Sequence, residues 1–128
     1  MSNTTQKDIT TQADIIELVN AFYKKVQNNE LIGPIFNEVV KDHWDEHLPK
    51  MYKFWGSVLL GSGEYNGNPM RKHVTLSQQF PLGHQHFESW LTLWNETVDE
   101  HFSGTKAEEA KVRADSIAGI MRFKVGAK

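Results

Sequence analysis

A run of apolar residues after His47 limits the possible fold of this chain more than any other feature of its sequence. Met51, Phe54, Trp55 and Val58 follow His47 at offsets of four, seven, eight and eleven residues. These offsets place the five side chains on one face of an α-helix, because the helix repeats every 3.6 residues. The run therefore predicts a helix whose apolar face carries one polar residue at its start.

Apolar residues recur at helical spacing in most of the remaining chain, and no segment alternates with period two. We therefore predict an all-α fold. Thr10 and Thr11 are candidate caps of the first helix, and Thr105 to Glu108 has the pattern of a capping box. The expected helical segments are residues 12–29, a short piece around Ile35–Val40, the stretch from near Asp42 to Gly61, the face Phe87–Val98 closed by Ser103-Gly104, and the stretch from Thr105 that buries Ala110, Ala114, Ile117 and Met121.

Length and composition set the remaining bounds. A chain of 128 residues suits one domain, which we place at residues 12–128, after a polar and flexible extension over residues 1–11. The net charge of −2 is spread along the chain and argues against a nucleic-acid or membrane surface. The start of the chain is polar and no run of 18 apolar residues occurs, so we expect a cytoplasmic protein.

Histidines stand before and after the apolar face, as a planar metal cofactor held between two segments would require. His47 precedes the face, and His73 lies in a segment, residues 61–85, that is rich in glycine and proline and is expected to be loop with a brief helical turn. The chain has no cysteine, which excludes thiolate-held metals and covalently attached haem. Non-covalent haem with His73 on the iron is the leading hypothesis, because apolar Val74 and Leu76 follow this histidine.

Tyr23 is the candidate for the opposite side of such a cofactor. It follows Phe22 on the inner edge of the first expected helix, where a tyrosine hydroxyl needs a hydrogen-bond partner. Dioxygen bound to haem iron carries partial negative charge and would be such a partner. The competing interpretation is a tyrosine at a helix edge whose hydroxyl reaches solvent.

These residues occur in an order and spacing that resemble the group III truncated haemoglobins over residues 12–123. The segments that carry the resemblance are Phe22-Tyr23, Gly33-Pro34-Ile35-Phe36, His47, Phe54-Trp55-Gly56-Ser57-Val58-Leu59-Leu60-Gly61, Tyr65-x-Gly67-x-Pro69-Met70, His73 and His86-Phe87-Glu88-Ser89-Trp90-Leu91. The resemblance implies a two-over-two helical globin sandwich around haem b. One departure is the stretch of residues 77–84, which is a few residues longer than the family pattern.

The resemblance also assigns roles to single residues. It implies that His73 is the proximal ligand of the iron and that Tyr23, His47 and Trp90 face the bound gas on the distal side. His47 is expected either to donate a hydrogen bond or to act as a gate. The other side chains expected to contact haem are Phe36, Met51, Phe54, Trp55, Tyr65 and Met70. Lysines and arginines at residues 50, 53, 71 and 72 are either partners of the haem propionates or simply solvated.

The implied function is reversible binding of dioxygen, and of carbon monoxide or nitric oxide, by a hydrogen-bonding pocket. Two donors to the bound gas slow its release, which suits chemistry with oxygen, nitric oxide or peroxide, or sensing, better than bulk oxygen delivery. An enzymatic role, as a nitric oxide dioxygenase or a peroxidase, stays open. A dioxygenase role would need a separate reductase, because the chain has no flavin or nicotinamide module.

Two other classes of function are open from the residues alone. His43 and His47 stand four residues apart on one helix face, so a non-haem zinc or iron site is the alternative. Its remaining ligands would come from Asp45 or Glu46 and from His84 and His86. A helical adaptor protein without a cofactor would explain the helices, but it would not explain why tyrosine, tryptophan and histidine residues gather on the facing surfaces.

Overall fold

Five helices make up the regular structure of the described residues, which are 6–40, 42–61 and 83–125 of the computed structural model. In chain order they are α1 (Gln12–Gln27), α2 (Gly33–Val40), α3 (Trp44–Leu60), α5 (His84–His101) and α6 (Thr105–Val125). The predicted all-α class is confirmed. The predicted positions of the helices agree with the structure to within a few residues, and α5 begins at His84, inside the segment expected to be loop.

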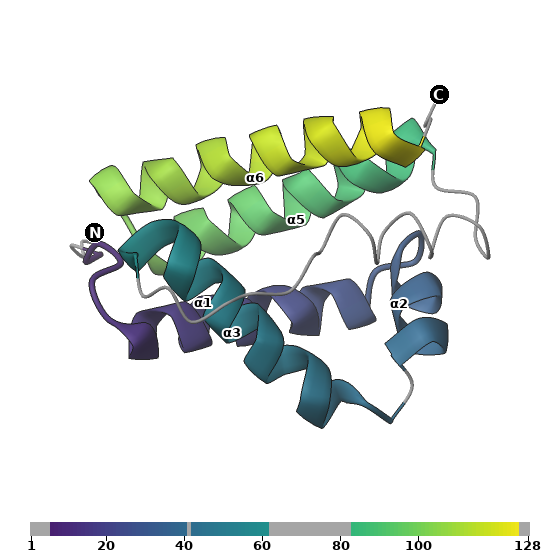
Figure 1. The fold of residues 1–128 in the computed structure, drawn as a ribbon, viewed down its shortest axis with the longest axis horizontal. Helices are drawn as coiled ribbons and strands as arrows, with labels where there is room; N and C mark the ends of the chain where they lie inside the picture. The colour runs from purple at the N-terminus through teal and green to yellow at the C-terminus, as the bar shows by residue number, and fades with distance from the viewer. Residues whose placement is uncertain (1–5, 41, 62–82, 126–128) are drawn as a thin grey trace.

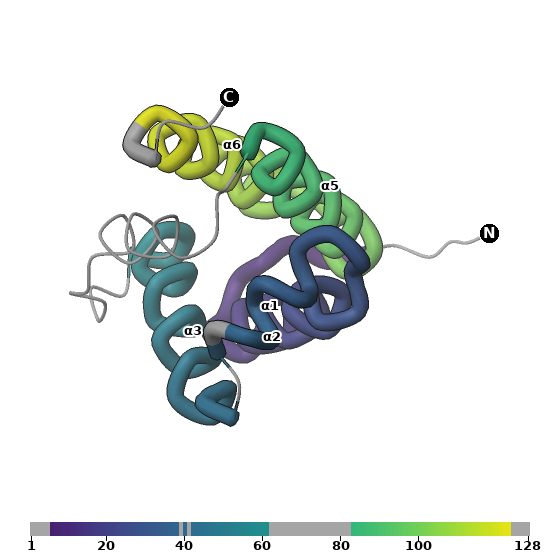
Figure 2. The backbone as a smooth tube through the Cα atoms, turned by 90° about the vertical axis from the view of Figure 1, so that its right-hand side faces the viewer, coloured from purple at the N-terminus to yellow at the C-terminus, as the bar shows by residue number. Residues whose placement is uncertain are grey.

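The helices form two layers. Helices α5 and α6 run side by side as an antiparallel pair, and this pair lies over α1 and α3 (Figures 1 and 2). Helix α1 is central, since it contacts α2, α3 and α5, and α6 contacts both α5 and α3. Side chains from α1, α3 and α5 therefore face the same interior, where the predicted site residues lie.

Local signals in the sequence explain where the helices begin and end. The Oγ1 atom of Thr11 accepts a hydrogen bond from the backbone N–H of Asp14 at 3.2 Å, which caps α1 as predicted. Gly61 ends α3 with φ of 68°, a left-handed conformation that glycine adopts without strain. None of the helices that the structure describes has the length and apolar character of a membrane span.

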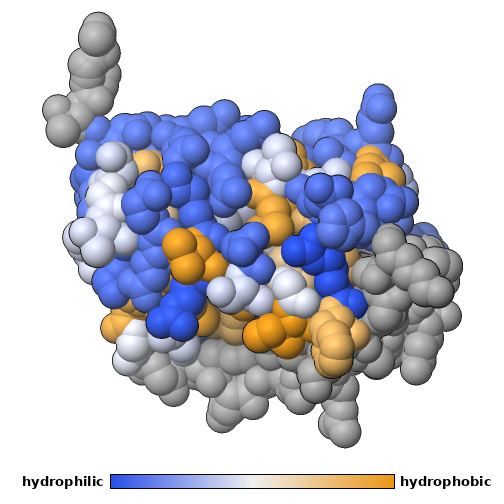
Figure 3. Space-filling view, turned by 90° about the horizontal axis from the view of Figure 1, so that it is seen from above, coloured by the Kyte–Doolittle hydropathy of each residue, from blue (hydrophilic) through white to orange (hydrophobic). Residues whose placement is uncertain are grey.

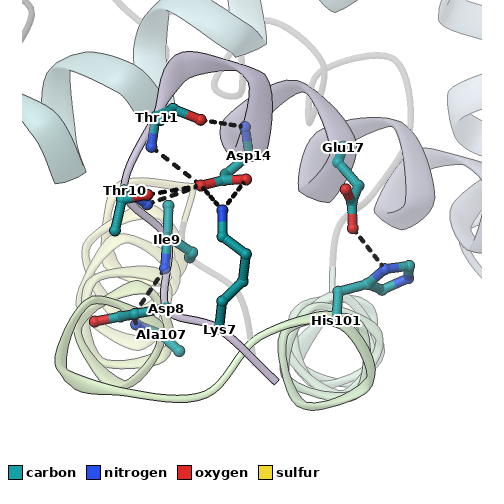
Figure 4. A network of polar contacts seen from close by, with 9 residues as sticks. All are labelled: Lys7, Asp8, Ile9, Thr10, Thr11, Asp14, Glu17, His101 and Ala107. Atoms are coloured by element: carbon teal, nitrogen blue, oxygen red, sulfur yellow. Dashed lines mark hydrogen bonds and ion pairs between the residues drawn. The ribbon is translucent and has the colours of Figure 1, made fainter. Parts of the chain in front are cut away.

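The first described residues differ from the flexible extension expected over residues 1–11. Ile9 is fully buried in the main core. The carboxylate of Asp8 accepts hydrogen bonds from the backbone N–H groups of Lys106, at 2.9 Å, and of Ala107, at 2.8 Å, and so caps α6. Figure 4 shows the contact of Asp8 with Ala107. The capping box expected from Thr105 is thus replaced by a carboxylate from the other end of the chain.

Asp14 holds the same segment against the start of α1. Its carboxylate is paired with the ammonium of Lys7 at 2.6 Å and accepts hydrogen bonds from the backbone N–H groups of Thr10 and Thr11, at 2.9 and 3.1 Å (Figure 4). Burial alone would raise the pKa of the Asp14 carboxyl, but these donors outweigh it and hold the pKa well below its usual range. The ionised form of Asp14 therefore stabilises the folded state.

This low pKa predicts a loss of stability in acid. Because the carboxyl of Asp14 binds its proton more weakly in the folded than in the unfolded chain, its contribution is complete above the unfolded pKa, about 3.9, and is lost as pH falls below it. We expect Asp14→Asn to lower the unfolding free energy at pH 7 by about 1.5–3 kcal/mol, with a gap to wild type that closes toward pH 2. Urea unfolding across this pH range measures the gap. The exposed Glu30 provides the control Glu30→Gln, and a gap independent of pH would contradict the assignment.

Candidate functional site

Tyr23 lies among aromatic rings from three helices. Its side chain comes from α1 and is only 6% exposed. Its ring lies 6.1 Å from Phe36 of α2, 5.6 Å from Trp44 of α3 and 5.2 Å from His47 of α3, measured between ring centroids. All three contacts are edge-on, an arrangement that aromatic rings favour. The structure thus brings together Tyr23 and His47, which the sequence predicted as neighbours in the distal pocket.

The hydroxyl of Tyr23 is a hydrogen-bond donor on a buried side chain. The rings of Phe22, Phe36, Trp44 and His47 lie around the Tyr23 ring. Burial raises the pKa of the Tyr23 hydroxyl above its usual range, so the group keeps its proton at any physiological pH. Since a buried hydroxyl gains from a partner, this one favours a ligand that accepts a hydrogen bond.

His47 is half-buried on α3 with its Nε2 atom inside the protein. Its ring stands nearly perpendicular to that of Tyr23, at 86°, and also contacts Trp44, with 5.6 Å between centroids. A ring in this position presents a nitrogen to the same interior as the tyrosine hydroxyl. The sequence predicted a helix whose apolar face begins at His47. In the structure this helix is α3, and it places His47 beside Tyr23.

Trp90 reaches the site from α5, on the other layer. Phe22 connects it to Tyr23, because the Phe22 ring lies 5.0 Å from Tyr23 and 5.8 Å from Trp90. Trp90 is half-buried and packs against the main core. Its indole carries an N–H group that can donate a hydrogen bond.

A stack of three indoles supports this wall. The ring of Trp94 lies 6.3 Å from Trp90 and 4.3 Å from Trp55, with angles of 7° and 21° between the ring planes. Trp94 is fully buried and its Nε1–H donates to the backbone oxygen of Ala110 at 3.1 Å. The stack joins α3, α5 and α6. The sequence placed Trp94 on a buried face but gave no sign that it connects Trp55 to Trp90.

The other predicted contacts of the cofactor divide into two sets. Phe36, Met51 and Phe54 are half-buried against the main core, and Trp55 is buried in it, stacked on Trp94. These positions agree with an apolar wall built by α2 and α3. The predicted proximal ligand His73 lies outside the described residues, as do Tyr65 and Met70. Lys50 and Lys53 are exposed on α3.

The described side of the site fits a haem group. A flat apolar cofactor needs aromatic and aliphatic walls, which Phe36, Met51 and Phe54 supply. A gas bound on its iron gains from hydrogen-bond donors near it, and the Tyr23 hydroxyl lies here beside the nitrogen-bearing rings of His47 and Trp44. The chemistry of these donors suits a ligand with partial negative charge.

The alternative of a non-haem metal site gains no support. Over residues 6–40, 42–61 and 83–125, no three histidine or carboxylate side chains gather closely enough to hold a metal ion. His43 is exposed before α3, and its nearest carboxylates, Asp42 and Glu46, are each 3.7 Å away. His86 serves instead as a local cap, since its Nδ1 atom accepts the backbone N–H of Gly83 at 2.8 Å.

Comparison with known proteins agrees with this geometry. A family model described as bacterial-like globin matches residues 5–123. Group 3 truncated hemoglobin ctb of Campylobacter jejuni is 36% identical over 110 residues, which is 84% of each chain. Group 1 truncated hemoglobin GlbN of Nostoc sp. is 27% identical over 119 residues, covering 92% of this chain and 93% of that protein.

A solved structure extends the agreement to the whole fold. The crystal structure of group III truncated hemoglobin from Campylobacter jejuni matches this one with a TM-score of 0.84 and 32% identity, over 94% of this chain and 95% of that chain. The predicted two-over-two globin sandwich is therefore confirmed. The chain belongs to the bacterial-like globin family and, within it, to the group III truncated haemoglobins.

Proposed function

We propose that this protein binds haem b through His73 and holds dioxygen and related diatomic gases beneath Tyr23, His47 and Trp90. Globin membership supports a haem cofactor and haem-based gas binding. The finer assignment depends chiefly on one observation, the buried Tyr23 hydroxyl among the rings of Phe36, Trp44 and His47.

The haem iron, when bound, supplies the reversible attachment of the gas, and the residues of the chain decide how long the gas stays. The hydroxyl of Tyr23 stays protonated and donates a hydrogen bond to an acceptor in the pocket. The Trp90 N–H is a second donor, fixed by the parallel contact of its ring with Trp94. His47, whose Nε2 atom is buried, either donates a further hydrogen bond to the same acceptor or acts as a gate to the pocket. The surrounding rings exclude water, which strengthens each of these bonds.

A pocket of this kind retains its ligand. A hydrogen bond to a charged acceptor contributes about 1.5–3 kcal/mol, and about 1.4 kcal/mol corresponds to a tenfold change in an equilibrium constant. Two such donors therefore favour slow release. We propose that the protein handles oxygen, nitric oxide or peroxide chemically, or senses them, and does not deliver oxygen in bulk. A nitric oxide dioxygenase activity would draw electrons from a separate reductase.

Absorption spectra test the haem assignment directly. Purified protein is mixed with one equivalent of haemin, and spectra are taken before and after dithionite and carbon monoxide. We expect a sharp Soret band that shifts with carbon monoxide in wild type. In His73→Gly the band weakens and imidazole added to the solution restores it, because the small ligand fills the vacated place on the iron.

His43→Gly is the matched control, since it removes an exposed histidine outside the proposed pocket. Its spectra are expected to equal those of wild type. Equal spectra for wild type and His73→Gly, with haemin only loosely associated in both, would contradict the assignment of His73. A change in His43→Gly alone would return attention to the metal alternative.

A further inference from the structure

Three rings beside the proposed pocket form a closed triangle of contacts. The ring centroid of Trp44 lies 5.6 Å from that of Tyr23 and 5.6 Å from that of His47, and Tyr23 and His47 are 5.2 Å apart. All three contacts are edge-on, with angles of 62°, 86° and 86° between the ring planes. Each ring is therefore held by the other two. The gas-binding role proposed above uses Tyr23 and His47, whereas Trp44 has no part in it.

Trp44 is the first residue of α3, and its ring packs inward from a mostly exposed stretch of chain. The residues on either side of it, His43 and Asp45, are exposed, whereas Trp44 is half-buried and packs against the main core. His47 follows three residues later, on the same side of the helix. Both side chains thus belong to residues 44–48, which we call the first turn of α3. A contact that fixes the ring of Trp44 also fixes the turn that carries His47.

The residue at the N-cap of α3 does not cap the helix. His43 occupies this position, and its side chain makes no capping hydrogen bond. Serine, threonine, aspartate or asparagine at an N-cap would satisfy a free backbone N–H group and stabilise the start of the helix. The first turn of α3 lacks this contribution, so its position depends more strongly on the contact of Trp44 with Tyr23 of α1.

Pro49 weakens the connection between the first turn and the rest of α3. This proline lies inside the helix and has no N–H group, so the backbone oxygen of Asp45 cannot receive the usual helical hydrogen bond from residue 49. The proline ring also crowds the same carbonyl group. The first turn is therefore bounded by an uncapped start on one side and by a missing hydrogen bond on the other.

The first turn lies at the end of α3 that is farthest from α5 and α6 (Figures 1 and 2). Figure 3 views the molecule from the side of α5 and α6, where separate apolar side chains lie among hydrophilic ones. The first turn is thus on the side turned away from the viewer in Figure 3. The ring contacts of Trp44 and His47 with Tyr23 connect this turn to α1.

We propose that Trp44 is a positioning residue for gas binding, which holds the first turn of α3 against α1 and so keeps His47 over the pocket. When the ring contacts of Trp44 break, the turn moves about Pro49 and takes His47 with it, so a gas enters and leaves faster. Trp44 acts through His47 and not on the gas itself. The kinetic part of this inference rests on the proposed function, whereas the positioning of the turn does not.

Amide hydrogen exchange tests the positioning without reference to haem. The N–H group of His47 donates to the backbone oxygen of His43 at 3.0 Å, and its exchange requires this bond to open. In the protein as purified, we expect Trp44→Leu to speed this exchange about tenfold or more, because two aromatic contacts are lost. Trp44→Phe keeps an aromatic ring in place and is expected to stay within about threefold of wild type.

Pro49→Ala tests the same turn with a variant that gains a hydrogen bond. Alanine restores the N–H group that Asp45 lacks, so exchange at His47 is expected to slow about tenfold or more. Glu46→Gln is the control, since it changes an exposed side chain of the same turn. Its exchange is expected to stay within about threefold of wild type.

Carbon monoxide association in the haem-loaded protein tests whether Trp44 acts through His47. Carbon monoxide accepts hydrogen bonds only weakly, so its binding after flash photolysis reports access to the pocket. We expect Trp44→Leu to bind it about tenfold faster than wild type, and Trp44→Phe to stay within about threefold. In a His47→Ala background, Trp44→Leu is expected to add less than about twofold, because the residue that it positions is absent.

Unchanged exchange or unchanged carbon monoxide association in Trp44→Leu would overturn the proposal. So would a full effect in the His47→Ala background, since Trp44 would then act by its own bulk. If circular dichroism shows that Trp44→Leu does not fold, Pro49→Ala decides, and exchange as fast as in wild type would overturn the proposal. A wild-type protein that forms no carbon monoxide complex would contradict the proposed function alone, and amide exchange would still decide the positioning.

Discussion

Tyr23→Phe is expected to release dioxygen about ten to a hundred times faster than the wild-type protein. The substitution keeps the ring contacts with Phe36, Trp44 and His47 and removes only the hydroxyl. A hydrogen bond to a charged acceptor is worth about 1.5–3 kcal/mol, and the lost bond appears as a faster dissociation rate. Stopped-flow displacement of dioxygen by carbon monoxide in the ferrous haem-loaded protein measures this rate.

Tyr52→Phe is the matched control for this experiment. Tyr52 lies on α3 and its hydroxyl donates to the Oδ1 atom of Asn20, on the exposed side of the protein. We expect Tyr52→Phe to leave the rate of dioxygen dissociation unchanged. Equal rates in wild type and Tyr23→Phe would remove Tyr23 from ligand binding and leave His47 and Trp90 as the donors.

Trp94→Ala is expected to cause the largest loss of stability, about 3–5 kcal/mol of unfolding free energy. Trp94 is fully buried, stacks on Trp55 at 4.3 Å and contacts Phe22 at 5.0 Å. Removing its ring leaves a cavity at the junction of α3, α5 and α6 and also removes the hydrogen bond to Ala110. Guanidinium unfolding followed by far-ultraviolet circular dichroism measures the loss.

Phe123→Ala provides the comparison for the truncation of Trp94, because it also removes an aromatic ring but from a side chain that is 86% exposed. Its unfolding free energy is expected to stay within about 0.5 kcal/mol of wild type. If both variants lost the same stability, Trp94 would not hold the place in the core that its contacts indicate.

The fold could be predicted because its helices are encoded locally. The apolar offsets after His47 predicted α3, and Gly61 predicted its end, since both depend only on neighbouring residues. The cap of α6 could not be predicted in this way. Asp8 stands 98 residues before Lys106, and no local pattern reveals a contact formed only after the helices pack.

The site could be predicted in part. Tyr23 was placed on an inner helix edge from its neighbour Phe22, and the structure confirms its burial. The role of Trp90 stays a prediction from resemblance to a family, because the placement of its side chain relative to Tyr23 depends on how the two layers meet. The indole stack around Trp94 could not be predicted for the same reason. The assignment of His73 stays a prediction, since this residue lies outside the described ones.

The indole stack also gives this protein a built-in optical signal. The chain has four tryptophans, and all of them, Trp44, Trp55, Trp90 and Trp94, lie on α3 and α5 beside the proposed pocket. The emission of indole overlaps the absorption of haem. Energy transfer to a cofactor in that pocket would therefore quench nearly all of the intrinsic tryptophan fluorescence. Loading and loss of the cofactor can therefore be followed in unlabelled protein, in real time and at nanomolar concentrations where the absorption spectrum is too weak.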